Sequence, residues 1–252
     1  MIATTKGNGL GANLYVAGYD LSNDVGQIDA LENGRGLLGM TGLDKSGHER
    51  LQGLQTGRIA FTGFFNDAAL QEHIALKLIP TADVIGTVFK TAALAAVACS
   101  LTGKRTNYPV TRAADGAMGT GTEILSNSDQ LNYGLALTAG KRTDTGATNG
   151  VGVDFGVGST TFGMVAYLHI FAFTGTSITV TIQESSDDAV GDPYAAVTGG
   201  AFTAATALGA QRIETSLTQT VERYLRAVTT GTFNPCTFAV MAKRYASAGA
   251  EK

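Results

Sequence analysis

Few residues in this chain have the types and spacing that acid–base or nucleophilic chemistry needs. The sequence has three histidines, and only His48 lies close to a hydroxyl and a carboxylate, those of Ser46 and Asp44. In a tight loop such neighbouring side chains point in different directions, and no pattern nearby supplies an oxyanion hole. We interpret His73 as a surface residue and His169 as a satisfied core histidine. The sequence therefore predicts no enzymatic activity.

Metal and thiol chemistry find equally little support. Cys99 lies in an apolar, alanine-rich run and Cys236 in a turn, and neither belongs to a CxxC pair or a Cys/His cluster. We interpret both as buried thiols of a reducing compartment. One acidic loop, residues 184–192, could bind Ca²⁺ but lacks the spacing of an EF-hand loop, and a solvated hairpin tip explains it better. Its carboxylates are those of Glu184, Asp187, Asp188 and Asp192. We expect neither a metal nor another cofactor.

The composition favours a β-rich protein that associates with copies of itself. Hydrophobic residues make up 44% of the 252 residues, but charged residues only 15%, against about 25% in a typical soluble domain. With 33 glycines and 4 prolines, short strands and turns are expected. A net charge of −3 without a basic patch argues against a protein that grips nucleic acid. No signal peptide or apolar run of membrane-spanning length is visible, so we expect synthesis in the cytoplasm and no membrane partner.

One amphipathic helix is expected near residues 67–79. Asn66 is a suitable N-cap, and Pro80 disfavours continuation of the helix. Large apolar residues recur every four positions on one face, at Leu70, Ile74 and Leu78. Before this helix, strands are expected at residues 14–22, 25–31, 37–43 and 58–65.

The pattern of apolar and polar residues changes after positions 140–150, a stretch without large apolar residues. We therefore predict a first β domain with one helix over residues 1–142, a linker over 143–149 and a second β domain over 150–252. Residues 165–173 are apolar on both faces and predict a fully buried strand. Residues 177–184 alternate between apolar and polar. The second domain is therefore expected to be a sandwich of jelly-roll or Greek-key kind.

Two long polar loops in the first domain carry mixed charge. Such loops in a compact domain are usually functional, and we predict that both contact neighbouring subunits. In the first loop the residues are Asp44, Lys45, His48, Glu49 and Arg50, and in the second they are Lys104, Arg105, Tyr108, Arg112 and Asp115.

Several stretches resemble major tail tube proteins of long-tailed, siphovirus-type bacteriophages, particularly those of actinobacteria. In order along the chain, they are LDKSGHERL (43–51), GRIAFTGFFN (57–66), HIALKLIPTADVI (73–85), NYPVTRAADG (107–116), AGKRTD (139–144), VDFG (153–156), FAFTGT (171–176) and RYLR (223–226). The alanine-rich residues 92–98 depart from the family's pattern. No single motif is a catalytic signature, and their order is the stronger signal.

The resemblance implies a tail-tube β-sandwich with one flanking helix, followed by the second sandwich. Such proteins form hexameric rings that stack into a hollow tube. It also implies a virion protein, made and assembled in the host cytoplasm, with tape-measure and tail-terminator proteins as partners. DNA is expected to pass through the tube without specific binding, because acidic walls repel phosphates.

Two other functions fit the composition. One is a different virion β-protein, such as a decoration or tail-tip component. The other is a glycan-binding module over residues 151–244, although the chain has no tryptophan to stack on a sugar.

Overall fold

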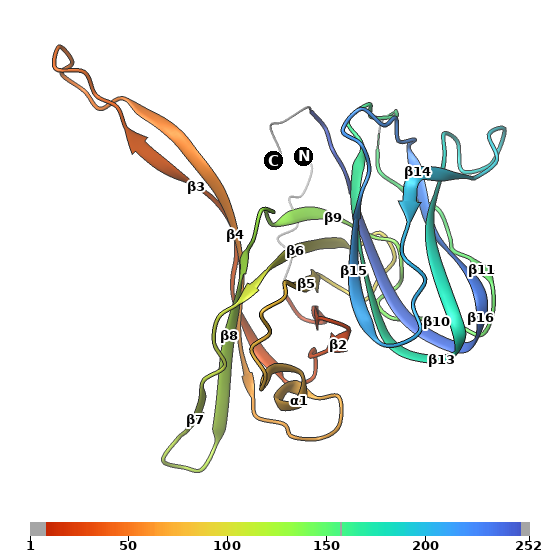
Figure 1. Ribbon diagram of the computed structural model, residues 1–252, viewed down its shortest axis with the longest axis horizontal. Coiled ribbons are helices and arrows are strands. Elements are labelled where there is room, and N and C mark those ends of the chain that lie inside the picture. Colours follow the sequence, from red (N-terminus) through yellow and green to blue (C-terminus); the bar gives the residue numbers. More distant parts are fainter. Residues whose placement is uncertain (1–8, 157, 248–252) are drawn as a thin grey trace, which may run out of the picture. The chain divides into compact units, whose positions relative to one another are not determined.

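The computed structural model describes residues 9–156 and 158–247, and it is mainly β, as the sequence predicts (Figure 1). The described residues form two compact units. Unit 1 comprises residues 9–23, 87–100, 133–156 and 158–247, and unit 2 comprises residues 24–86 and 101–132. Strands β5 (Val84–Phe89) and β6 (Val97–Arg105) contribute residues to both units.

Unit 1 is built on one long antiparallel pair of strands. Its two strands, β13 (Met164–Ser185) and β16 (Tyr224–Arg244), pair along nearly their whole length. Shorter strands pair with one or the other of them: β9 (Asn132–Ala136), β10 (Arg142–Asp144), β11 (Thr148–Asn149), β12 (Val153–Asp154), β14 (Ala195–Ala201) and β15 (Gly209–Glu214). Strands β1 (Asn13–Val16) and β2 (Tyr19–Asp20) pair with each other.

The long strand pair of β13 and β16 curves and so buries its own inner face (Figure 1). Its register shifts three times between Ile170 and Ser177, and such irregularities bend a strand pair. Gly175 and Gly231 lie at this bend with φ of +143° and +120°, and a Cβ at either would meet backbone atoms about 2.5 Å away. The bend places both halves of β13 in one core, which includes Leu168, Ile170, Ile178, Val180 and Ile182.

The first half of β13 is buried on its second face as well. Val165, Tyr167 and His169 are at most 1% exposed. Tyr15 packs against Phe89 with ring centroids 5.4 Å apart, and its ring lies 5.9 Å from that of His169. The predicted strand with two buried faces is therefore confirmed for residues 165–170.

His169 is a satisfied core histidine, as predicted. The Gly18 N–H donates to Nδ1 at 3.2 Å, so Nε2 carries the proton of the neutral ring and donates to Thr87 Oγ1 at 2.8 Å. Thr87 Oγ1 lies 2.6 Å from Ser100 Oγ. Burial lowers the pKa of His169 from 6.5 to about 3, because a charged imidazolium would lose its hydration there.

Unit 2 contains a long β-hairpin and a short helix. Strands β3 (Val25–Gly39) and β4 (Arg50–Phe64) pair with each other, and β4 also pairs with β8 (Met118–Ser126). Strand β8 continues the sheet to β6 and to β7 (Val110–Arg112). Ile59, Phe61 and Ile124 are the centre of the core, each at most 1% exposed. Gly86 allows β5 to approach, since a Cβ there would lie 2.7 Å from Ile124 Cδ1.

The predicted helix over residues 67–79 is wrong in extent, because α1 covers only Glu72–Leu76. Leu70 has a φ of +63°, which excludes a helix at that point. Asn66 does not cap the helix: its side-chain oxygen accepts from the Ala68 N–H, whereas the Glu72 N–H donates to Asp24 at 3.0 Å. The four-residue recurrence of apolar residues was therefore coincidental, and the buried residues of α1 are Glu72 and Leu76.

Two strand predictions need the same kind of correction. The expected strands 25–31 and 37–43 belong to one strand, β3, which ends at Gly39. The expected strand 58–65 is only the inner half of β4, which begins at Arg50. The hydrophilic residues between the expected strands were interpreted as strand ends, but a hairpin that is exposed on both faces can include them.

The predicted linker, residues 143–149, lies inside unit 1. Its ends belong to β10 and β11, which both pair with β16. Arg142 and Asp144 form two hydrogen bonds of 2.9 and 2.6 Å, and Asp144 also accepts from Thr229 at 2.7 Å. The compact units thus divide the chain at other positions, and independent folding on either side of residues 143–149 stays a prediction.

The neutral state of His169 predicts how stability depends on pH. Below pH 6.5 this histidine becomes protonated in the unfolded chain, whereas in the native protein His169 stays neutral until about pH 3. The free energy of unfolding should therefore fall as the pH falls through this window, by up to about 1.4 kcal/mol per pH unit from this residue. Urea unfolding between pH 7 and pH 4 measures the slope. A His169→Gln variant should show a shallower slope, and an unchanged slope would contradict the assignment.

Candidate self-association surface

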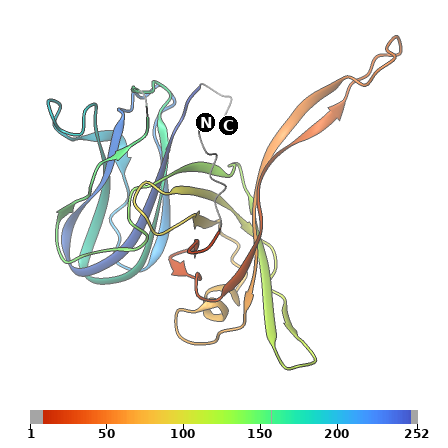
Figure 2. The same cartoon turned by 180° about the vertical axis from the view of Figure 1, so that it is seen from behind.

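A two-stranded arm extends from unit 2 (Figure 2). Strand β4 pairs with β8 only from Arg58 to Phe64. In residues 34–56, which we call the arm, the described pairings join β3 and β4 only to each other. Both long edges of the arm therefore present unpaired backbone groups, which are templates for another strand.

The arm exposes its apolar side chains to an unusual degree. Every residue from 32 to 52 is exposed. Six large apolar side chains of the arm are each more than half exposed: Leu37, Leu38, Met40, Leu43, Leu51 and Leu54. Leu38 lies directly opposite Leu51, and Leu37 points to the other face. An isolated two-stranded hairpin is at best marginally stable in water, so this surface is suited to being covered by another molecule.

The root of the arm is fastened by polar contacts. The Asn33 amide donates to the Leu131 carbonyl at 2.7 Å and accepts from the Leu131 N–H at 2.8 Å. The Gly57 N–H donates to Ser126 Oγ at 2.7 Å, and a Cβ at Gly57 would lie 2.5 Å from the Leu131 nitrogen. Arg58 lies 2.8 Å from Glu123 in an ion pair that raises its pKa. These contacts fix the direction in which the arm leaves the unit.

The first predicted contact loop lies at the end of the arm. Asp44, Lys45, His48, Glu49 and Arg50 are all exposed there, in or next to the loop of residues 40–49 that joins β3 to β4. Lys45 lies 3.8 Å from Asp44 and 3.7 Å from Glu49. The structure thus brings the five residues together at the tip, and their role in subunit contacts stays a prediction.

The second predicted loop separates into buried and exposed residues. Arg112 and Asp115 are exposed, at the turn that joins β7 to β8. Lys104 forms an ion pair of 2.8 Å with Asp83 and also donates to the Thr81 carbonyl. Arg105 is only 4% exposed and donates to the Leu78 carbonyl. Its side chain is therefore unavailable to another subunit, contrary to the expectation for this residue.

Tyr108 belongs to a buried polar cluster that sequence reasoning missed. The Glu72 carboxylate, fully buried, accepts from Thr120 at 2.6 Å and from Tyr108 at 2.8 Å. Asp24 accepts from the Glu72 N–H and from Asn66. Burial raises the pKa of Glu72 above its usual value and outweighs the two hydroxyl donors, which lower it. The cluster joins α1 to the segments before β3 and β7.

His73 is not a simple surface residue, because it is half-buried beside this cluster. Its ring centroid lies 4.7 Å from that of Phe65, and Nδ1 lies 3.3 Å from the Tyr108 hydroxyl. The sequence offered one signal for the cluster, Glu72 within the expected helix, but its partners are distant in sequence.

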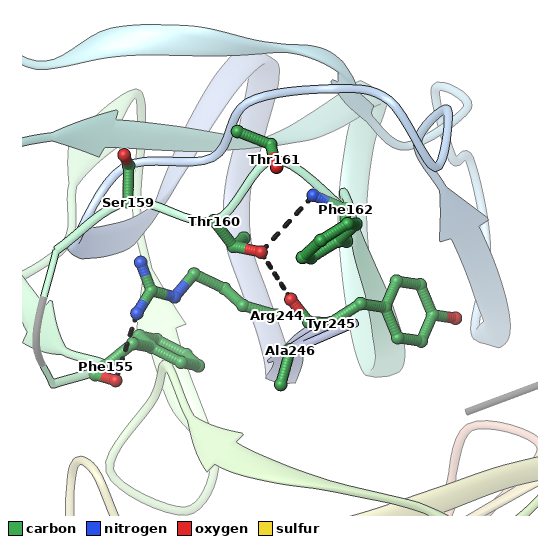
Figure 3. Close-up of a pocket in the computed structure, with 8 residues that line it drawn as sticks. All are labelled: Phe155, Ser159, Thr160, Thr161, Phe162, Arg244, Tyr245 and Ala246. Atoms are coloured by element: carbon green, nitrogen blue, oxygen red, sulfur yellow. Dashed lines mark hydrogen bonds between the residues drawn. The ribbon is translucent and has the colours of Figure 1, made fainter. Parts of the chain in front are cut away.

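Unit 1 contains a pocket of about 420 Å³, lined by residues of segments 155–162 and 244–246 (Figure 3). Arg244 crosses it, but its guanidinium donates to the carbonyls of Gly158, Glu222 and Phe155 at 2.8 to 3.1 Å. Thr160 likewise donates to the Tyr245 carbonyl. The lining residues include no carboxylate, histidine or cysteine, so the pocket offers little for catalysis.

The carboxylates of the acidic loop accept hydrogen bonds from nearby backbone N–H and hydroxyl groups. Asp187 accepts from the N–H groups of Asp192, Gly191 and Val190 at 2.6 to 3.1 Å, and these bonds lower its pKa. Asp188 accepts from the Tyr194 hydroxyl at 2.6 Å. Across residues 9–156 and 158–247, no three or more His, Cys, Asp or Glu side chains converge as a metal site. Both cysteines are free and buried, as predicted.

Comparisons with known proteins add little to these observations. No protein-family model and no curated protein matches the chain. One similar solved structure is the SPP1 Dit (gp 19.1) protein, described as a paradigm of the hub adsorption apparatus in phages that infect Gram-positive bacteria. The match covers 92% of this chain and 99% of that chain at 12% identity, with a TM-score of 0.33. A likeness this low carries no argument about fold or function. No helix in the described residues is long and apolar enough to cross a membrane.

The buried cluster predicts the effect of removing one hydroxyl. Tyr108→Phe deletes a donor to the buried Glu72 carboxylate, so the free energy of unfolding should fall by about 1–3 kcal/mol. The matched control is Tyr19→Phe, since the Tyr19 hydroxyl makes no hydrogen bond with the described residues. Thermal and urea unfolding measure both variants. Equal losses in the two variants would argue against a special role for the cluster.

Proposed function

We propose that this protein is a structural component of a phage tail, and that it assembles with copies of itself into the tail tube. The observation that carries self-assembly is the arm, whose large apolar side chains and strand edges are left uncovered by the described chain. The order of the tail-tube-like motifs along the sequence supports the assignment to the tube.

The chemistry of the surface supports association with copies rather than with nucleic acid. Charged residues are only 15% of the chain and the net charge is −3. An apolar interface between copies gains free energy by removing area from water, at about 25 cal/mol per Å². DNA binding would instead require clustered Lys and Arg side chains on one face. DNA is then a passenger in the tube, without specific contacts.

The remaining parts of the proposal follow from the resemblance. Rings of the tube are hexameric, tape-measure and tail-terminator proteins are the partners, and the site of action is the virion tail. The protein needs no metal and has no catalytic role.

Assembly of the purified protein tests the proposal directly. At high concentration the full chain should form long hollow tubes, visible by electron microscopy and pelleted by ultracentrifugation. Short closed rings that never extend would favour a tail-tip component instead. A protein that remains monomeric under all assembly conditions would refute self-assembly.

Two arm substitutions should weaken this assembly without unfolding the chain. Leu38→Thr with Leu51→Thr replaces a cross-strand apolar pair that is more than half exposed and keeps residues that favour strands. Burying a fully exposed Leu contributes about 1.5–3 kcal/mol, and these two side chains are only about half exposed. Association should therefore weaken at least about 10-fold while the melting temperature stays nearly constant. The control is Val190→Thr, because Val190 is 88% exposed but lies outside the arm. Equal assembly of both variants would show that the arm is not the contact.

A further inference from the structure

One face of the β13–β16 pair, opposite the core, carries polar and aromatic side chains next to one another. The register places Gln183 opposite Arg226, and Asp154 of β12 opposite Tyr224. Because Arg226 and Tyr224 are two residues apart on β16, these four side chains share one face of the sheet. Leu225, between them, belongs to the core on the other face.

Tyr194, just before β14, is held against this face as a rigid ring. It stacks on Arg226, whose guanidinium carbon lies 4.0 Å from the ring centroid. Nε and Nη2 of Arg226 donate to Gln183 at 2.9 and 2.7 Å, and the Tyr194 hydroxyl donates to Asp188 at 2.6 Å. Tyr194 is partly exposed, and no second ring or cation of the described residues stacks on it. The ring face opposite Arg226 is therefore left for a ligand.

The backbone around this ring accepts strain to bring the tyrosine and the carboxylate together. Asp188 and Ala189 have φ of +61° and +66°, a left-handed conformation that is costly for residues other than glycine and is typical of ligand sites. A Cβ at Gly152 would lie 2.1 Å from the Tyr194 hydroxyl and 2.2 Å from an Asp188 carboxylate oxygen. Only glycine at position 152 leaves space for this pair.

Tyr224 provides a second aromatic ring beside the first. The guanidinium carbon of Arg223 lies 4.9 Å from its ring centroid, and Arg223 donates to both carboxylate oxygens of Asp154 at 2.8 and 2.5 Å. These hydrogen bonds lower the pKa of Asp154 to about 2, so its carboxylate is charged at neutral pH. Both tyrosine rings thus have an arginine against the ring and a carboxylate near its edge.

The charges around the rings select among the ligands that stack on aromatic side chains. A cationic ligand is disfavoured, because Arg226 and Arg223 already lie against the rings. A nucleic acid is disfavoured as well, since the carboxylates of Asp188 and Asp154 repel phosphates. A neutral pyranose has an apolar C–H face that suits a tyrosine ring, and hydroxyl groups at its edge that donate to carboxylates.

We propose that this face of unit 1, centred on Tyr194, binds a neutral pyranose sugar. The C–H face of the sugar stacks on the free face of the Tyr194 ring, and its hydroxyls donate to Asp188. Tyrosine thus takes the part for which the chain has no tryptophan. The ligand class is a polysaccharide that presents such rings on a surface. All the residues belong to unit 1 of one chain, so this binding does not depend on the proposed self-assembly.

Saturation-transfer NMR on the purified full chain tests the proposal. The probes are the methyl pyranosides of glucose, galactose, mannose and N-acetylglucosamine. At least one should receive saturation, most strongly at the C–H protons of one ring face. Tyr194→Ala should weaken that binding by about 10-fold, whereas Tyr194→Phe should retain most of it. The matched control is Phe64→Ala, because Phe64 is 63% exposed but lies in unit 2.

Two further variants separate sugar binding from folding. Asp188→Asn keeps the size of the side chain and removes the charge, and Gly152→Ala displaces Tyr194 from Asp188 without changing either residue. Both should weaken binding at an unchanged melting temperature. If none of the four sugars receives saturation, or if binding survives in folded Tyr194→Ala and in Asp188→Asn, the proposal is wrong. Absence of tubes by electron microscopy would refute the proposed function and leave this result intact.

Discussion

A hairpin of two strands has no interior, and this constraint governs unit 2. A side chain such as Leu38 can reach only neighbours within the arm, such as its cross-strand partner Leu51. The described chain supplies no third strand and no second layer there. The arm is therefore positioned entirely from its root, where Asn33 satisfies both backbone groups of Leu131 and so imitates a strand pairing with a side chain. Its own apolar surface contributes little until another molecule covers it.

Polar contacts also position the opposite end of unit 2, around α1. The segment around α1 has too few buried apolar residues to pack stably against the sheet, since only Glu72 and Leu76 of the helix are buried. The Glu72 carboxylate and the Arg105 guanidinium replace the missing core with directional bonds to Thr120, Tyr108 and the Leu78 backbone. Bonds to charged groups contribute about 1.5–3 kcal/mol each. Leucine and isoleucine side chains in this segment are thereby free to face outwards.

Alternation of polarity predicted the elements that bury their side chains within their own unit. The strand around His169 was predicted because both of its faces are apolar, and both are indeed covered. The predictions for the arm and for α1 were wrong because a pattern of apolar residues does not show whether their side chains pack within the same chain. Leu70 and Leu78 matched a helical spacing but are exposed. The buried position of Glu72 could not be predicted because Asp24 and Thr120, its partners, are each 48 residues away. The subunit-contact role of both loops remains a prediction.

The two long antiparallel strand pairs of this chain, β3 with β4 and β13 with β16, differ in what flanks them. Both have three register shifts, so irregular pairing alone does not separate them. The pair of β13 and β16 bends at Gly175 and Gly231, and six further strands, β9, β10, β11, β12, β14 and β15, pair along its edges. The arm has the same antiparallel ladder, yet its edges carry no such strands in the described residues. The cover that β14 and β15 give to the β13–β16 pair is thus missing from the arm in the described residues, and the proposed contact with a second copy would provide it.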